Sequence, residues 1–264
     1  MGASVLESRQ RREKIMRNIK LTLEYDGSRY SGWQRLGKGE SSNTIENKIL
    51  DILYKMDGQK VELNCGCRTE AGVHAYGQVV NFKTNTALKP YEIKNYLNRY
   101  LPMDIAVLDA EEKPERFHAA LNAKGVTYLY RVAIGDVPSV FERKYTYYSF
   151  KTPDVDRMRK AAEGLLGNHD FKNFSTVKKS KSTEREVKAI DIYQDPEEIQ
   201  ITMTASGFLH NMARMVVSTL LEIGLGKREI DAAVKVLDGR EEASAPAAAQ
   251  GLFLQDVLYL ELEV

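Results

Sequence analysis

The chain has 264 residues, of which 43% are hydrophobic and 28% charged, a composition typical of a globular protein with one large or two modest domains. A net charge of +1 excludes a uniformly basic nucleic-acid binder, so any surface for a polyanion must come from local clusters of Lys and Arg. No apolar run approaches the roughly eighteen residues that a membrane helix needs. The cysteines, Cys65 and Cys67, suit neither a disulfide framework nor a closed zinc site, so we expect reduced thiols and a cytoplasmic protein.

The first part of the chain predicts a flexible extension followed by a compact unit. Residues 1–17 carry basic side chains without an apolar core, and we expect them to form a flexible N-terminal extension. Hydrophobic periodicity, helix caps and turn residues then predict a strand at 18–25, a helix at 45–57, strands at 61–65 and 78–84, a helix at 90–100 and a strand at 105–110. This order is that of a ferredoxin-like unit.

The second part of the chain repeats the same order of elements, although no sequence identity between the parts is visible. It predicts a strand at 126–134, a helix at 153–166, strands at 186–193 and 199–205, helices at 208–223 and 228–237 and a strand at 257–262. We therefore expect an α+β protein with two ferredoxin-like halves, residues 18–117 and 118–264, each with an antiparallel sheet. The Lys-rich and Ser-rich residues 175–185 predict a mobile loop between two of these elements.

The run GCRTEAGVHA, residues 66–75, is the motif that most strongly suggests chemistry. Its single acid, Glu70, lies between an Arg and the small residues Ala71 and Gly72, where a carboxylate contributes little to packing. Glycines permit a sharp turn with positive φ, which lifts Glu70 out of the preceding strand. The pattern predicts a loop that presents one carboxylate.

This run closely resembles the catalytic loop of the tRNA pseudouridine synthase A family, which reads GRTDAGVHA. Five further stretches are similar to family signatures in the same order: EYDGSRYSGWQR, LNRYLP, GNHDFKNFS, FLHNMARMVVSTL and APAAAQGLFLQDVLY. The resemblance covers nearly the whole chain and implies a homodimer, with the two halves of each subunit forming an RNA-binding cleft. It implies isomerisation of uridine to pseudouridine in the anticodon arm of tRNA, without cofactor or metal.

Arg214 is a candidate that the residues themselves single out. It lies on an apolar helix, where a buried guanidinium without an acid partner is costly, whereas an Arg at the helix surface would extend its head group to solvent. The resemblance makes Glu70 the catalytic acid that Arg214 holds in place and keeps ionised. It also makes Tyr128 the residue that stacks on the uracil, although alternation alone favours an ordinary core tyrosine.

The expected contacts to the substrate come from two segments of the chain. The resemblance implies that Arg68 assists extrusion of the base and contacts phosphate, and we include His74 of the same motif among the substrate-binding residues. We expect Lys178, Lys179 and Lys181 to bind the tRNA backbone, together with Arg185. The alternative for each of these cations is a solvated side chain on a loop.

Three positions depart from the family pattern. Glu70 stands in place of Asp, Ala120 in place of an Arg, and Ser218 in place of a Gly. A Glu carries its carboxylate one carbon further out, and misplacing a reacting group by ~1 Å can cost roughly a hundredfold in rate. Two interpretations follow: a synthase adapted to Glu70, or a catalytically inactive tRNA-binding homodimer that has lost the Asp. Retention of Arg68, Tyr128 and Arg214 favours the synthase.

Overall fold

Ten strands form a single sheet in the computed structural model, which describes residues 16–34, 39, 41–177 and 182–260. The strands are β1 (Arg17–Tyr25), β2 (Leu63–Cys65), β3 (His74–Thr84), β4 (Ile105–Lys113), β5 (Ala123–Ala133), β6 (Tyr147–Tyr148), β7 (Gly167–Asp170), β8 (Glu184–Gln194), β9 (Glu198–Ala205) and β10 (Leu252–Tyr259). The α-helices are α1 (Ile45–Asp57), α2 (Pro90–Tyr100), α3 (Val155–Glu163), α4 (Met212–Gly224) and α5 (Ala232–Leu237).

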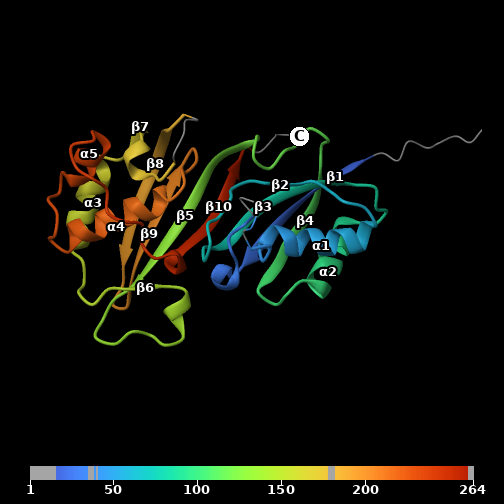
Figure 1. Cartoon of the computed structure of the whole chain (residues 1–264), viewed down its shortest axis with the longest axis horizontal. Coiled ribbons are helices and arrows are strands. Elements are labelled where there is room, and N and C mark those ends of the chain that lie inside the picture. The colour runs from blue at the N-terminus through green and yellow to red at the C-terminus, as the bar shows by residue number, and fades with distance from the viewer. Residues whose placement is uncertain (1–15, 35–38, 40, 178–181, 261–264) are drawn as a thin grey trace, which may run out of the picture.

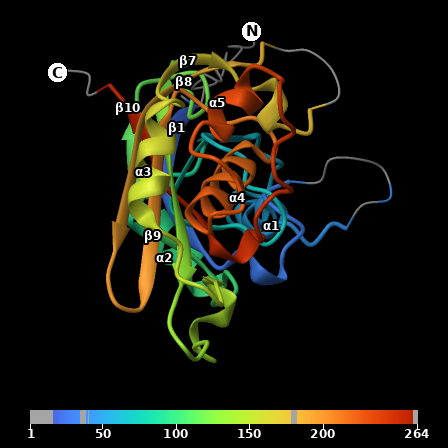
Figure 2. The ribbon, with the colours of Figure 1, turned by 90° about the vertical axis from the view of Figure 1, so that its left-hand side faces the viewer.

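The strand order is β4-β1-β3-β10-β5-β9-β8-β7, with β2 paired to β3 and β6 paired to β5. Helices α1 and α2 lie at one end of the molecule and α3, α4 and α5 at the other (Figure 1). Figure 2 shows the latter end face on. The predicted α+β class and the antiparallel pairing within each half are therefore confirmed.

The final strand, β10, joins the two halves. It pairs antiparallel with β5 and runs parallel to β3, where Phe253 is opposite His74 and Leu254 is opposite Ala75. The sequence predicted a sheet for each half, and the structure instead has one continuous sheet. Because β10 is a distant part of the chain inserted between β3 and β5, no local pattern reveals this connection.

The helix-end signals in the sequence are confirmed at α1. The Thr44 side chain accepts a hydrogen bond from the Asn47 backbone N–H, and Gly58 ends the helix with φ 72°. Its predicted apolar face is buried, including Ile45 and Ile49. The boundaries of other elements differ more from the prediction.

Several boundaries shift, those of the strands because tertiary pairing overrides local pattern. Strand β3 begins at His74 and β10 begins at Leu252, each several residues before the predicted start, because they pair with neighbouring strands there. Helix α4 begins at Met212 because Asn211 has a left-handed backbone. Arg17, expected in the extension, begins β1 opposite Thr84, and residues 1–15 lie outside the described residues.

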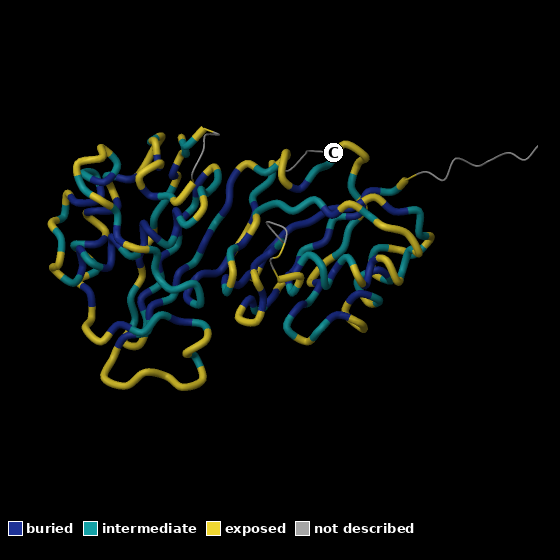
Figure 3. The backbone as a smooth tube through the Cα atoms, in the orientation of Figure 1, coloured by how far each residue is buried: buried dark blue, intermediate teal, exposed yellow. Residues whose placement is uncertain are grey.

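Burial follows the sheet (Figure 3). The core includes the side chains of Phe82, Tyr130 and Ile201, which are fully buried on central strands. The connection between β5 and β6 is exposed, and Phe141 within it is 86% accessible. In the part of the chain that the structure describes, no helix is long and apolar enough to cross a membrane.

Candidate active site

Residues 66–73 form the connection between β2 and β3, and buried neighbours hold its backbone. Gln78, fully buried on β3, accepts a hydrogen bond from the Cys67 N–H at 3.3 Å and donates to the Cys67 carbonyl at 2.5 Å. The Tyr25 hydroxyl lies 2.7 Å from the Thr69 hydroxyl oxygen. The predicted left-handed glycine is present at Gly72, where φ is 78°. The connection is therefore held before Glu70 by these hydrogen bonds and turns sharply after it at Gly72.

The Glu70 carboxylate reaches from this connection to the start of α4. Its Oε2 lies 2.8 Å from Nη1 of Arg214, and its Oε1 accepts a hydrogen bond from the backbone N–H of Asn211 at 2.5 Å. Both side chains are mostly buried, with exposed fractions of 21% for Glu70 and 18% for Arg214. Charge-assisted bonds of this kind are stronger than neutral ones. The acid partner that the sequence predicts for Arg214 is present.

Arg214 is fixed by more than the acid. Its Nε donates to the Ala247 carbonyl at 2.5 Å, and its Nη1 also donates to the Asn211 side-chain oxygen at 3.1 Å. The Ala247 N–H returns a hydrogen bond to the Arg214 carbonyl at 3.1 Å. The guanidinium is thus directed at Glu70, which excludes the alternative of an arginine extended to solvent.

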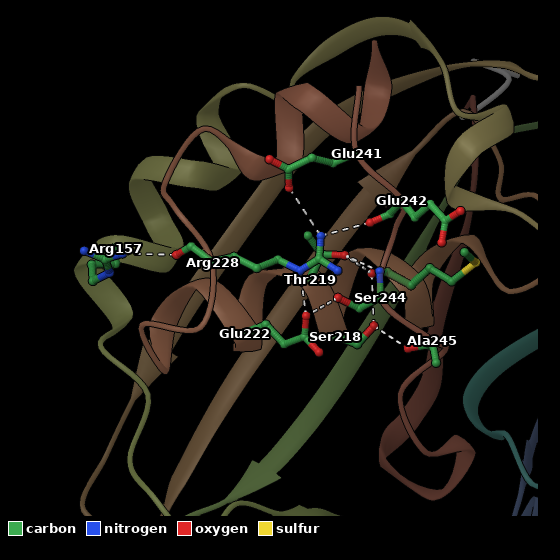
Figure 4. A network of polar contacts seen from close by, with 10 residues as sticks. Arg157, Ser218, Thr219, Glu222, Arg228, Glu241, Glu242, Ser244 and Ala245 are labelled. Carbon is green, nitrogen blue, oxygen red and sulfur yellow. Dashed lines mark hydrogen bonds and ion pairs between the residues drawn. The ribbon is translucent and has the colours of Figure 1, made fainter. Parts of the chain in front are cut away.

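The segment that carries Ala247 is itself tied to α4 (Figure 4). The Ser218 hydroxyl donates to the Ala245 carbonyl at 2.7 Å and so ties this segment to α4. Glu222 accepts from Ser244 at 2.6 Å and from Arg228 at 2.7 Å. Partial burial opposes ionisation of Glu222, but these hydrogen bonds outweigh burial and lower its pKa. The carboxylate therefore stays ionised and holds the segment that orients Arg214.

A cleft of about 870 Å³ opens at this pair and is lined by both halves of the chain. Its lining includes four of the predicted site residues, Arg68, Glu70, Tyr128 and Arg214. It also includes residues that the sequence did not single out as site residues, among them Cys67, Phe208, His210 and Asn211. Arg68 is exposed at the cleft. The expected departure Ala120 also lines it, so an apolar methyl stands there.

Tyr128 forms part of the cleft wall and is only 5% exposed. Its hydroxyl lies 3.4 Å from the Cys67 Sγ, and its ring contacts Phe208 edge-on with centroids 5.0 Å apart. Burial raises the pKa of Tyr128 well above its usual range and that of Cys67 to about 11. Both groups are therefore neutral near pH 7, and Cys65 and Cys67 carry free thiols.

The structure does not bring His74, predicted as a substrate-binding residue, to the cleft. His74 is 1% exposed and stacks on Phe253 with ring centroids 4.6 Å apart. Its Nδ1 accepts from the Gly27 N–H at 3.1 Å, and its Nε2 lies 3.1 Å from the Lys144 carbonyl. Burial lowers its pKa, so a neutral ring bridges these segments as a structural element.

The predicted cationic loop lies only partly in the described structure. Lys178, Lys179 and Lys181 lie outside the described residues. Arg185 is half-buried beside Gly207 of the cleft, and burial lowers its pKa. The sequence did not identify Asn211, which lies inside the helix predicted at 208–223, and its residue type is the only sign that it tolerates a left-handed backbone.

The fold and the site together define a two-part α+β protein whose central cleft presents a carboxylate held by an arginine. A family model described as tRNA pseudouridine synthase matches residues 22–121 and 161–260. The chain therefore belongs to the tRNA pseudouridine synthase family, and it is an isomerase that forms pseudouridine in tRNA.

Relatives match this chain over almost its whole length. The tRNA pseudouridine synthase A 2 of Bacillus anthracis is 43% identical over 246 residues, which cover 92% of this chain and 99% of that protein. The tRNA pseudouridine synthase A of Bacillus sp. (strain KSM-64) is 44% identical over 246 residues, which cover 92% of this chain and 100% of that protein. Among solved structures, an archaeal box H/ACA sRNP Nop10–Cbf5 complex has a TM-score of 0.32 and 12% identity, covering 78% of this chain and 42% of that one.

Proposed function

We propose that this enzyme isomerises uridine in the anticodon stem-loop of tRNA, with Glu70 as the nucleophile. One observation carries the proposal: the Glu70 carboxylate is fixed by Arg214 in the cleft that Tyr128 and Arg68 also line. We also propose that it works in the cytoplasm without a cofactor. The cleft supports an RNA substrate because its exposed cation, Arg68, lies beside the acid in the sequence and in the cleft lining.

The reaction explains why these residue types are needed. Pseudouridine formation breaks the N-glycosidic bond, turns the uracil and rejoins it to the ribose through carbon. The Glu70 carboxylate can attack ribose C1′ or uracil C6, or remove the C2′ proton, and each route needs it ionised. Arg214 places its positive charge 2.8 Å from the carboxylate and holds the acid in position.

Uridine must leave the helical stack before it can react, at a cost of about a few kcal/mol. We propose that the uracil regains stacking on the aromatic wall that Tyr128 and Phe208 form in the cleft, where Phe208 is the more exposed ring. Arg68 is exposed at the cleft, where it is suited to contact a phosphate of the displaced nucleotide. We propose Lys178, Lys179 and Lys181 as further contacts to the tRNA backbone.

The intact Glu70–Arg214 pair also supports the synthase over the inactive alternative. With its extra methylene, the Glu70 side chain places its carboxylate against the start of α4, where Asn211 and Arg214 bind it. The side chain stays 21% exposed. A protein that had lost the chemistry has no need for a carboxylate that is held by both an arginine and a helix N-terminus. We therefore expect the Glu70 carboxylate, as Arg214 and Asn211 hold it, to be catalytically active.

Substitutions of Glu70 test this function directly, with pseudouridine in purified tRNA mapped after incubation with each variant. Glu70→Gln keeps the shape without the nucleophile, so we expect activity to fall at least about a thousandfold while tRNA affinity stays nearly unchanged. Glu70→Asp draws the carboxylate back by one carbon, so we expect activity to fall roughly a hundredfold. Activity gained by Asp would instead identify Glu70 as a lost nucleophile and leave the inactive tRNA-binding protein as the better account.

A further inference from the structure

Asn211, the residue directly before α4, has an unusual backbone. Its φ is 64° and its ψ is 0°, and among the described residues it is the only non-glycine with positive φ. The left-handed region is costly for most side chains, and Asn is among the few that tolerate it. Such conformations persist where the surroundings fix them, and they concentrate at functional sites.

This backbone directs one N–H group at the Glu70 carboxylate. The Asn211 N–H donates to Oε1 at 2.5 Å, while Arg214 binds the other oxygen, Oε2, at 2.8 Å. The two donors therefore fix both carboxylate oxygens and with them the plane of the group. In a right-handed conformation the same N–H would point elsewhere, because φ sets the direction of the groups on either side of Cα.

The Asn211 side chain fixes the second donor as well. Its Oδ1 accepts from Nη1 of Arg214 at 3.1 Å, and its Nδ2 donates to the Thr176 hydroxyl oxygen at 2.9 Å. The Thr176 oxygen also lies 2.6 Å from Nδ1 of His210. Asn211 thus contacts the acid through its backbone and the arginine through its side chain.

We propose that Asn211 is a positioning residue for the reaction, and that its left-handed backbone sets the orientation in which Glu70 attacks. The inference rests on the proposed role of Glu70. It goes beyond that role because it assigns the orientation of the carboxylate to a residue that lies at the start of α4 and acts only through Glu70 and Arg214.

Three substitutions separate the backbone from the side chain. Asn211→Gly and Asn211→Ala both remove the amide, but only Gly adopts the left-handed region without cost. Asn211→Val adds a β-branched side chain, for which positive φ is an outlier. We expect kcat within about threefold of the unaltered enzyme for Gly, about tenfold lower for Ala and about a hundredfold lower for Val. The KM for tRNA should change less than about twofold in all three, because the N–H bonds the acid and not the substrate.

The measurement is single-turnover and steady-state pseudouridine formation, with thermal melting of every variant and assays well below each melting temperature. Gly and Ala variants of equal kcat would overturn the inference, because the backbone conformation would then carry no catalytic effect. Unchanged kcat in all variants, with lower melting temperatures, would overturn it by showing a merely structural role. Glu70→Gln assayed in parallel separates the two proposals: its activity would refute the role of Glu70, whereas its inactivity with a flat Asn211 series would refute only the role of Asn211.

Discussion

The Glu70 side chain bridges the two halves of the molecule. The acid comes from the β2–β3 connection of the first half, and its partners Asn211 and Arg214 come from the second. A shorter Asp at this position would have to move closer to α4 to keep both bonds. The hydrogen bond from Ser218 to Ala245 holds the same segment whose Ala247 carbonyl accepts from Arg214.

Arg68 gives a prediction for a single cation at the cleft. Each phosphate contact that is lost lowers the slope of log affinity against log salt, by about 1 for one contact. We expect Arg68→Gln to weaken tRNA binding and lower that slope, as measured by filter binding at several salt concentrations. Arg99→Gln is the matched control, because Arg99 is an exposed arginine on α2 outside the cleft lining. Equal slopes for both variants would refute the phosphate contact.

The sequence allowed only part of this site to be predicted. An acid partner for Arg214 was predictable, because a buried guanidinium on an apolar helix is costly without one, and the family resemblance pointed to Glu70 as that acid. The burial of His74 was not, because its bonds to Gly27 and to the Lys144 carbonyl come from distant segments. The role of Asn211 was not predictable either, because residue type indicates a left-handed backbone only weakly.

At the scale of elements, the β2–β3 connection is supported from below by the segment before α1. Gly32 has φ 91°, and a Cβ placed there would meet the Thr69 carbonyl oxygen at 2.9 Å and the Glu70 carbonyl carbon at 3.1 Å. The Trp33 N–H donates to the same Thr69 carbonyl at 2.9 Å. The backbone that carries Glu70 therefore rests directly on a glycine.

Gly32→Ala tests this support. The added methyl group should push the connection outward, and a displacement of ~1 Å at Glu70 predicts a loss of kcat of about tenfold to a hundredfold. Gly58→Ala is the control, because Gly58 also has positive φ but a Cβ there meets nothing within 4 Å. It should lose about 1 kcal/mol of stability with kcat unchanged. Chemical denaturation and kcat of both variants check the prediction, which equal kcat values would contradict.

The elements themselves were more predictable than their ends. Helix α1 follows its cap and its apolar face because both signals are local. Strand β10 starts at Leu252 because it pairs there with Tyr130 of β5, and the helix expected from residue 208 starts at Met212 because Asn211 breaks it. Long-range pairing and a single unusual φ decide these boundaries, and neither can be read from hydrophobic periodicity.

For the whole molecule, the continuous sheet determines how the cleft is built. Strand β10 fixes β3 against β5, so the connection that carries Glu70 and the helix that carries Arg214 keep a set distance. Both sides of the cleft come from one chain. The residues that line the cleft come from both halves of this chain.

The last prediction at this scale concerns the oligomeric state. We propose a C2 homodimer, in which one subunit acts on the uridine while its partner contacts a distant part of the same tRNA. Light scattering across a broad concentration range should give the mass of two chains. Titrations with tRNA should saturate at one tRNA for each cleft of the dimer. A monomer at all concentrations would contradict the homodimer without touching the site, since Glu70→Gln would still abolish activity. If the protein is a monomer and modifies full-length tRNA, the cleft of a single chain is sufficient for docking.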